Sequence, residues 1–232
     1  MRNQHLSLAV TALGFSYATP PEGLVGDVVR FDNMDALRAS SDASDALAGR
    51  IVFVDDSMTR TKDGSGYGPA ASKRNLAAIE GMKRGAIAAL IRSVATSNHR
   101  FPHTGKMAYA EVGESIPAAA LAVPDADQLT RALENGPVTV RLSLDTDHPG
   151  LQPSGNVIAE IPGRELPDEI VLLGAHLDSW DLGTGALDDG AGVAIVTAAA
   201  RLIIESGLQP RRTIRVVLFG AEETGVQGGK FY

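Results

Sequence analysis

The stretch that decides the fold is EIVLLGAHLDSWDLGTGALDDGAGVAIVTAAARLIIESG, residues 169–207. It opens with an apolar run typical of a buried strand, continues through a loop of glycine and aspartate, and ends in an alanine-rich helical segment closed by Gly207. A second apolar run, RRTIRVVLFGAEE, follows at residues 211–223. Apolar strands joined by a crossover helix are typical of a parallel sheet that is covered on both sides. The sequence therefore predicts an α/β fold in this half of the chain.

Acidic residues and one histidine stand at the predicted carboxyl ends of these two strands. His176 and Asp178 follow the first strand, residues 222–223 are both glutamate and follow the second, and residues 188–189 are both aspartate and precede the helix. Ligands collect beyond the carboxyl ends of parallel strands, and gathered carboxylates repel one another unless protons or cations neutralise them. The pattern therefore predicts a divalent metal site, and zinc is the simplest choice for imidazole and carboxylate ligands.

The spacing of these residues indicates separate roles. His176 and Asp178 have the spacing of a metal ligand and the carboxylate that orients its imidazole. Glu222 and Glu223 suit a division of labour, in which one binds metal and the other takes a proton from the attacking water. Asp188 is placed to bridge two metals about 3.5–4 Å apart. Taken singly, the aspartates fit turns and helix caps equally well, and His176 fits a half-buried residue bonded to backbone, so only the combination indicates metal.

Two motifs carry a resemblance to a known family. GAHLDSWDLGTGALDDGAG, followed about thirty residues later by FGAEETG, resembles the co-catalytic di-zinc exopeptidases of the aminopeptidase and carboxypeptidase Q type. The stretches SYATPPEG, GRIVFVD, GAIAALIRSV and PHTGKMAY resemble the carboxypeptidase Q branch, in which a protease-associated (PA) domain is inserted near the start of the peptidase domain. The resemblance implies a mostly parallel-sheet metallopeptidase with two Zn²⁺ ions, acting on the terminal peptide bonds of small peptides as an aminopeptidase, dipeptidase or carboxypeptidase.

The resemblance also implies a role for each matching residue. His176 would bind one metal, Asp188 would bridge both, and Glu223 would bind the other. Glu222 would be the general base and acid, and Asp178 would orient His176. In this family the peptide bond that follows the bridging aspartate is often cis.

The sequence departs from the family pattern after the Glu-Glu pair. The family uses two further ligands downstream, an aspartate and a histidine, whereas no histidine follows His176 here. We therefore expect a C-terminally truncated peptidase in which each metal lacks one protein ligand, and an inactive chain as given. The alternative is a non-catalytic PA module that binds peptides or proteins and carries a vestigial peptidase domain.

Three segments follow from composition and resemblance. Residues 1–18 are predicted to be an N-terminal piece of the peptidase domain, residues 19–147 the α/β PA domain, and residues 148–232 the partial peptidase domain. The Asp-, Pro- and Gly-rich stretch at residues 145–155 is the predicted linker. Within the PA segment we predict a helix capped by Ser72 and another capped by Asp125.

Charge and composition limit the partners. The formal net charge is −7 and there is no Lys/Arg cluster, which argues against nucleic acid. There is no cysteine, and no apolar run approaches the roughly 18 residues needed to span a bilayer. No signal peptide is visible, so localisation is left open, with a secreted or periplasmic protein suspected from the family. A small peptide is the expected substrate, and a homodimer is one alternative for assembly.

Overall fold

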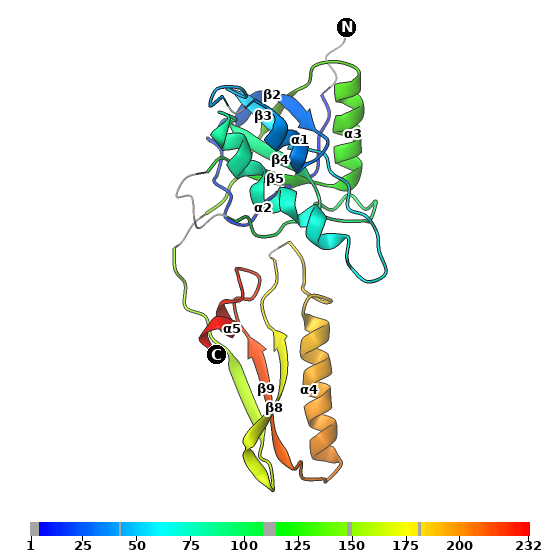
Figure 1. The fold of residues 1–232 in the computed structure, drawn as a ribbon, viewed down its shortest axis with the longest axis vertical. Coiled ribbons are helices and arrows are strands. Elements are labelled where there is room, and N and C mark those ends of the chain that lie inside the picture. The colour runs from blue at the N-terminus through cyan, green and yellow to red at the C-terminus, as the bar shows by residue number, and fades with distance from the viewer. Residues whose placement is uncertain (1–4, 42, 109–114, 148–149, 181) are drawn as a thin grey trace. The chain divides into compact units, whose positions relative to one another are not determined.

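The computed structural model describes residues 5–41, 43–108, 115–147, 150–180 and 182–232. The chain divides into two compact units, Met1–His148 and Pro149–Tyr232, and both contain helices and strands (Figure 1). The boundary between the units falls inside the predicted linker segment. Nowhere in the described ranges is a helix long and apolar enough to cross a membrane.

The first unit is built on a six-stranded sheet in the order β1-β5-β4-β3-β2-β6. Its four central strands, β2 to β5, pair in parallel, and the two edge strands pair antiparallel to their neighbours. The strands are β1 Val10–Ala12, β2 Leu24–Phe31, β3 Arg50–Val54, β4 Ala88–Arg92, β5 Ala118–Leu121 and β6 Thr139–Leu142. Every residue of β4 and β5 is buried, because helices cover both faces of the sheet.

Three helices make up the outer layers of this unit: α1 Met34–Ala39, α2 Tyr67–Lys83 and α3 Val123–Glu134. Leu37 of α1 and Ala77 of α2 share one apolar cluster with Val52 of β3. Leu129 of α3 belongs to a second cluster with Phe53, the next residue of β3. Because successive side chains of a strand point to opposite faces, α1 and α2 cover one face of the sheet and α3 covers the other.

The two predicted helices exist, but neither begins at its predicted cap. Helix α2 begins at Tyr67, before Ser72. Helix α3 begins at Val123, and no side chain caps it. Asp125 is instead buried and accepts hydrogen bonds from Arg100 and from the backbone N–H of Ala9. A long-range ion pair thus replaces the local capping contact that the sequence predicted.

Strand β1 belongs to the first unit. Val10 pairs with Leu121 of β5, and Leu13 is buried in the core of this unit. This differs from the prediction that residues 1–18 form a piece of the peptidase domain. The physical reason is that the short apolar patch pairs with β5 on the side opposite β4, and so forms the edge strand of this sheet.

The second unit has a three-stranded sheet in the order β7-β9-β8. Its elements are β7 Val157–Ile161, β8 Leu166–His176, α4 Gly190–Glu205, β9 Arg212–Phe219 and α5 Gln227–Phe231. Strands β8 and β9 are parallel and joined through α4, as predicted, but β7 is antiparallel to β9. The four residues between β7 and β8 are too few for the crossover that parallel strands need. The prediction of a mostly parallel sheet is therefore wrong for β7, and the sheet is mixed.

Candidate active site

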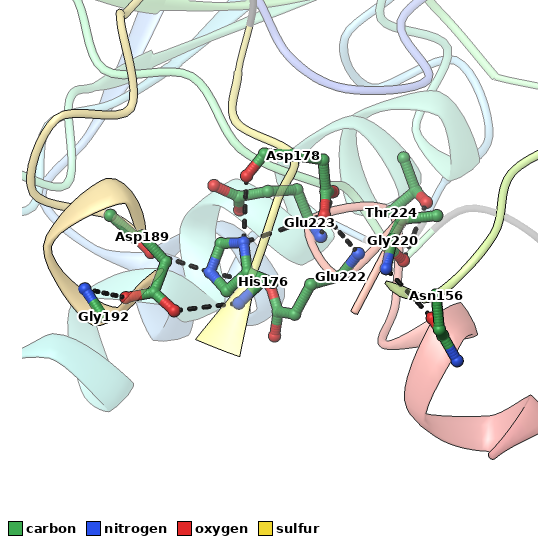
Figure 2. Close-up of polar contacts among 11 residues, drawn as sticks. Asn156, His176, Asp178, Asp189, Gly192, Gly220, Glu222, Glu223 and Thr224 are labelled. Carbon is green, nitrogen blue, oxygen red and sulfur yellow. Dashed lines mark hydrogen bonds and ion pairs between the residues drawn. The ribbon is translucent and has the colours of Figure 1, made fainter. Parts of the chain in front are cut away.

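The parallel pair β8 and β9 brings the predicted site residues to one edge of the sheet. His176 is the last residue of β8 and pairs with Phe219, the last residue of β9. The backbone N–H of Leu177 then donates to the carbonyl oxygen of Phe219 over 2.8 Å. Figure 2 shows His176 between Asp189 on one side and the Glu222–Glu223 turn on the other. The topology therefore produces the gathering that the sequence predicted.

The imidazole of His176 has a polar partner on each ring nitrogen. Nδ1 lies 2.9 Å from the backbone oxygen of Asp178, and Nε2 lies 3.0 Å from Oδ1 of Asp188. Oε2 of Glu222 is 3.9 Å from the same Nε2. Burial alone would lower the pKa of His176, but its bonds to Asp178 and Asp188 and the nearby carboxylates raise this pKa above its ordinary value. The site is thus strongly negative around a single imidazole.

Asp178 acts through a different contact from the one predicted. Its carboxylate accepts hydrogen bonds from the backbone N–H groups of Glu222 and Glu223, over 2.9 and 3.0 Å. The distance from this carboxylate to Nδ1 of His176 is 3.7 Å, which is too long for a hydrogen bond. The group that orients His176 is the backbone carbonyl of Asp178. The side chain instead fixes the turn that carries the two glutamates.

Asp189 joins helix α4 to strand β8. It is the N-cap residue of α4, and its Oδ1 accepts from the N–H of Gly192 over 3.1 Å. Its other oxygen accepts from the backbone N–H of His176 over 3.0 Å. The peptide bond between Asp188 and Asp189 is cis, as the family resemblance implied. Asp181, for which the sequence indicated no role, lies outside the described residues.

Glu222 and Glu223 lie in the turn that follows β9, and both are half-buried. Burial raises the pKa of Glu223, the negative charges of Asp188 and Glu222 raise it further, and a hydrogen bond from Trp180 lowers it. Trp180 therefore touches the site. Sequence alone does not indicate this contact, because a lone tryptophan gives no sign of where its indole N–H points.

The donor chemistry fits a cation beside His176. If Nδ1 carries the proton that bonds Asp178, Nε2 of the neutral ring is an acceptor that faces the acceptor Oδ1 of Asp188. Two acceptors at 3.0 Å repel each other unless a proton or a cation joins them. Tetrahedral zinc with bonds of about 2.0–2.1 Å separates its ligand atoms by about 3.3 Å, which is close to this distance.

The metal shell is only partly assembled. Within the portion of the chain that the structure describes, no three His, Cys, Asp or Glu side chains are gathered so that they could hold a metal ion. His176 and Asp188 converge as predicted, whereas Glu223 does not complete a three-ligand cluster with them. The residues that the structure brings together are thus an incomplete donor set for zinc.

Comparison with known proteins places this fold and site in a class. Residues 156–232 match the profile of peptidase family M28. Human carboxypeptidase Q is 38% identical over 97% of this chain and 46% of that protein. A probable lipoprotein aminopeptidase of Mycobacterium tuberculosis is 32% identical over 95% of this chain and 40% of that protein. The second unit thus matches a peptidase family profile and has an α/β fold.

Solved structures agree with this class. The crystal structure of a peptidase M28 precursor from Shewanella amazonensis superposes with a TM-score of 0.84 and 47% identity, over 97% of this chain and 51% of that one. A zinc aminopeptidase from Bacillus subtilis shares the fold, with a TM-score of 0.63 and 23% identity over 97% of this chain and 48% of that one. Residues 156–232 thus carry the match to peptidase family M28, and nearly the whole chain is similar to its carboxypeptidase Q relatives. It spans about half the length of the curated relatives it matches.

Proposed function

We propose that the protein to which this chain belongs is a zinc-dependent exopeptidase that hydrolyses terminal peptide bonds of small peptides. The observation that carries the proposal is the approach of Nε2 of His176 to Oδ1 of Asp188 over 3.0 Å, with a carboxylate oxygen of Glu222 3.9 Å from that nitrogen. The names of the relatives, carboxypeptidase and aminopeptidase, support the reaction class. The first unit is proposed to be the PA-type domain, and the lipoprotein name of one relative supports an exported protein.

The residues divide into ligands and a proton carrier. His176 and Asp188 would hold zinc, with Asp188 bridging to a second ion that Glu223 would bind. When bound, zinc would polarise the substrate carbonyl and stabilise negative charge in the transition state. Glu222, whose side chain is 38% exposed, can reach a water molecule. It would take the proton of the attacking water and return it to the leaving amine.

Substitution of Glu222 tests the proposal in the full protein. Glu222→Gln keeps the shape of the side chain but removes the base, so we expect peptidase activity on dipeptides to fall about 10²–10⁴-fold while zinc affinity is retained. Glu205→Gln on α4 is the matched control, because Glu205 bonds Arg201 on the same exposed face of the helix. Full activity of Glu222→Gln would remove Glu222 from the mechanism. Activity that survives complete chelation of metal would overturn zinc dependence.

Measuring zinc binding distinguishes the proposed enzyme from the non-catalytic alternative. The absence of a three-ligand cluster among the described residues favours that alternative, in which the unit retains the fold without a working site. We expect the 232-residue chain to bind one zinc ion weakly at best and to be inactive or nearly so towards peptides. Calorimetric titration of zinc distinguishes the cases. Two tight sites per chain would contradict the incomplete shell, and no binding to the full protein would favour the non-catalytic module.

A further inference from the structure

The turn that carries Glu222 and Glu223 has an unfavourable backbone. Ala221 has a φ of 53° and Val226 a φ of 59°. Both lie in the left-handed region, which residues with a Cβ atom rarely adopt and which is a true outlier for β-branched valine. Such a conformation persists only where surrounding contacts impose it. Because Ala221 directly precedes Glu222, whatever imposes this conformation also determines where the two glutamates point.

Asn156 holds both ends of this turn. It is the residue before β7, and its Oδ1 accepts from the backbone N–H of Gly220 over 3.1 Å. Its Nδ2 donates to the backbone oxygen of Gly228 over 2.9 Å. The N–H of Gly228 in turn donates to the oxygen of Gly220 over 3.0 Å. One side chain therefore closes the loop of residues 220–228 at its base, and Figure 2 shows Asn156 beside Gly220 on the side away from His176.

Both bracketing glycines lie too close to neighbouring atoms to carry a Cβ atom. A Cβ atom at Gly228 would lie 2.4 Å from Oδ1 of Asn156, and one at Gly220 would lie 2.6 Å from the backbone oxygen of Gly155. Both distances are far below van der Waals contact, so the turn is built around close approach of segment 154–156. Only an amide side chain of this length supplies a donor and an acceptor together here, since aspartate lacks the donor and leucine lacks both.

We propose that Asn156 is a positioning residue for the Glu222–Glu223 pair. It fixes the base of loop 220–228 from the β7 side, while the carboxylate of Asp178 fixes its tip through the two glutamate N–H groups. The proposal rests on the function proposed above for the two glutamates. Asn156 itself contacts no predicted ligand of zinc, so its effect on the site passes through the backbone of the loop.

Two substitutions of Asn156 in the full protein test this role. Asn156→Leu removes both hydrogen bonds with little change of shape, and Asn156→Asp keeps the acceptor for Gly220 but loses the donor to Gly228. We expect faster amide hydrogen exchange across residues 220–228 in both variants, and zinc affinity, measured against a fluorescent chelator, about 10-fold lower for Asn156→Leu. Asn156→Asp should show the smaller loss and serves as the test where Asn156→Leu does not fold.

Ser206→Ala is the matched control in the same unit. Ser206 also bonds a backbone carbonyl, that of Ile203 at the end of α4, so its loss lowers stability without touching the loop. We expect its zinc affinity and the exchange of residues 220–228 to stay at wild-type values. Wild-type exchange in the loop of a folded Asn156→Leu protein would overturn the proposal. If the wild-type protein binds no zinc, the proposed function fails instead, and the exchange measurement still decides the role of Asn156.

Discussion

The two carboxylate oxygens of Asp178 accept hydrogen bonds from the successive backbone N–H groups of Glu222 and Glu223, over 2.9 and 3.0 Å. These bonds join residues more than forty positions apart, in the segments that follow the two parallel strands β8 and β9. They determine the backbone direction of the turn from which both glutamate side chains leave. The carboxylate of Asp178 therefore holds the glutamate turn, while its backbone carbonyl contacts the imidazole of His176.

Asp178→Asn tests this relationship. Asparagine keeps one acceptor but presents an NH₂ group to the second N–H, so one hydrogen bond to a charged acceptor is lost and two donors face each other. We expect a loss of about 1–3 kcal/mol in the free energy of unfolding of the second unit. Trp180 is the only tryptophan of the chain, so its fluorescence during urea unfolding reports on this unit. Unchanged stability together with unchanged zinc affinity would show that the two bonds do not hold the turn.

Asp189→Ala tests the link between α4 and β8. Loss of the N-cap contact to Gly192 should cost about 1 kcal/mol, as N-cap substitutions typically do. The same change also frees the backbone N–H of His176, so we expect lower zinc affinity as well. Asn33→Ala is the matched control, since Asn33 caps α1 in the first unit through the N–H of Ala36. A drop in zinc affinity of equal size in both variants would contradict a specific role for Asp189.

The sequence predicts which residues meet at the sheet edge, because the strand–helix–strand pattern determines how the strands pair. Two apolar strands joined by a crossover helix favour parallel pairing, which β8 and β9 adopt, and this brings His176 and the Glu222–Glu223 pair to one edge. The partner of the Asp178 carboxylate does not follow. It depends on where backbone N–H groups point in a turn that contains a left-handed alanine, Ala221, and residue type carries no information on that conformation.

In the fold, too, some features can be predicted from local sequence patterns and others depend on contacts between distant residues. The burial of β4 and β5 follows from their continuous apolar runs. The membership of β1 depends on pairing with β5, a strand distant in sequence, which short-range periodicity does not encode. The direction of β7 follows instead from the short connection to β8. Asp125 has the residue type of a helix cap, yet it pairs with Arg100 over 2.7 Å and no side chain caps α3. Asn156 holds the loop that carries the two glutamates, but nothing in the sequence distinguishes it from an ordinary turn residue.

The outer surface of α4 predicts self-association of the isolated chain. No residue of this helix is buried, and Ile195 and Leu202, two turns apart on one face, are 68% and 66% exposed. An exposed apolar face of this kind favours association. We expect light scattering after gel filtration to show species larger than a monomer, and the double variant Ile195→Lys/Leu202→Lys to shift them towards the monomer. A monodisperse wild-type monomer would show that this apolar face does not cause the chain to associate.

Lys73 gives the first unit a pH-dependent stability. Its side chain is fully buried in α2 and donates one hydrogen bond, to the carbonyl oxygen of Ala70. Burial lowers its pKa from 10.5 to about 8. Between these two pH values the unfolded chain binds more protons than the folded chain, so the free energy of unfolding should rise with pH, by up to about 3 kcal/mol at about 1.36 kcal/mol per pH unit.

Lys73→Met should abolish this rise and stabilise the unit at pH 7, as circular dichroism during urea unfolding at pH 7 and pH 9.5 can measure. Lys83→Met, at an exposed lysine of the same helix, should leave the rise intact, and an equal effect of both substitutions would show that burial of Lys73 is not its cause.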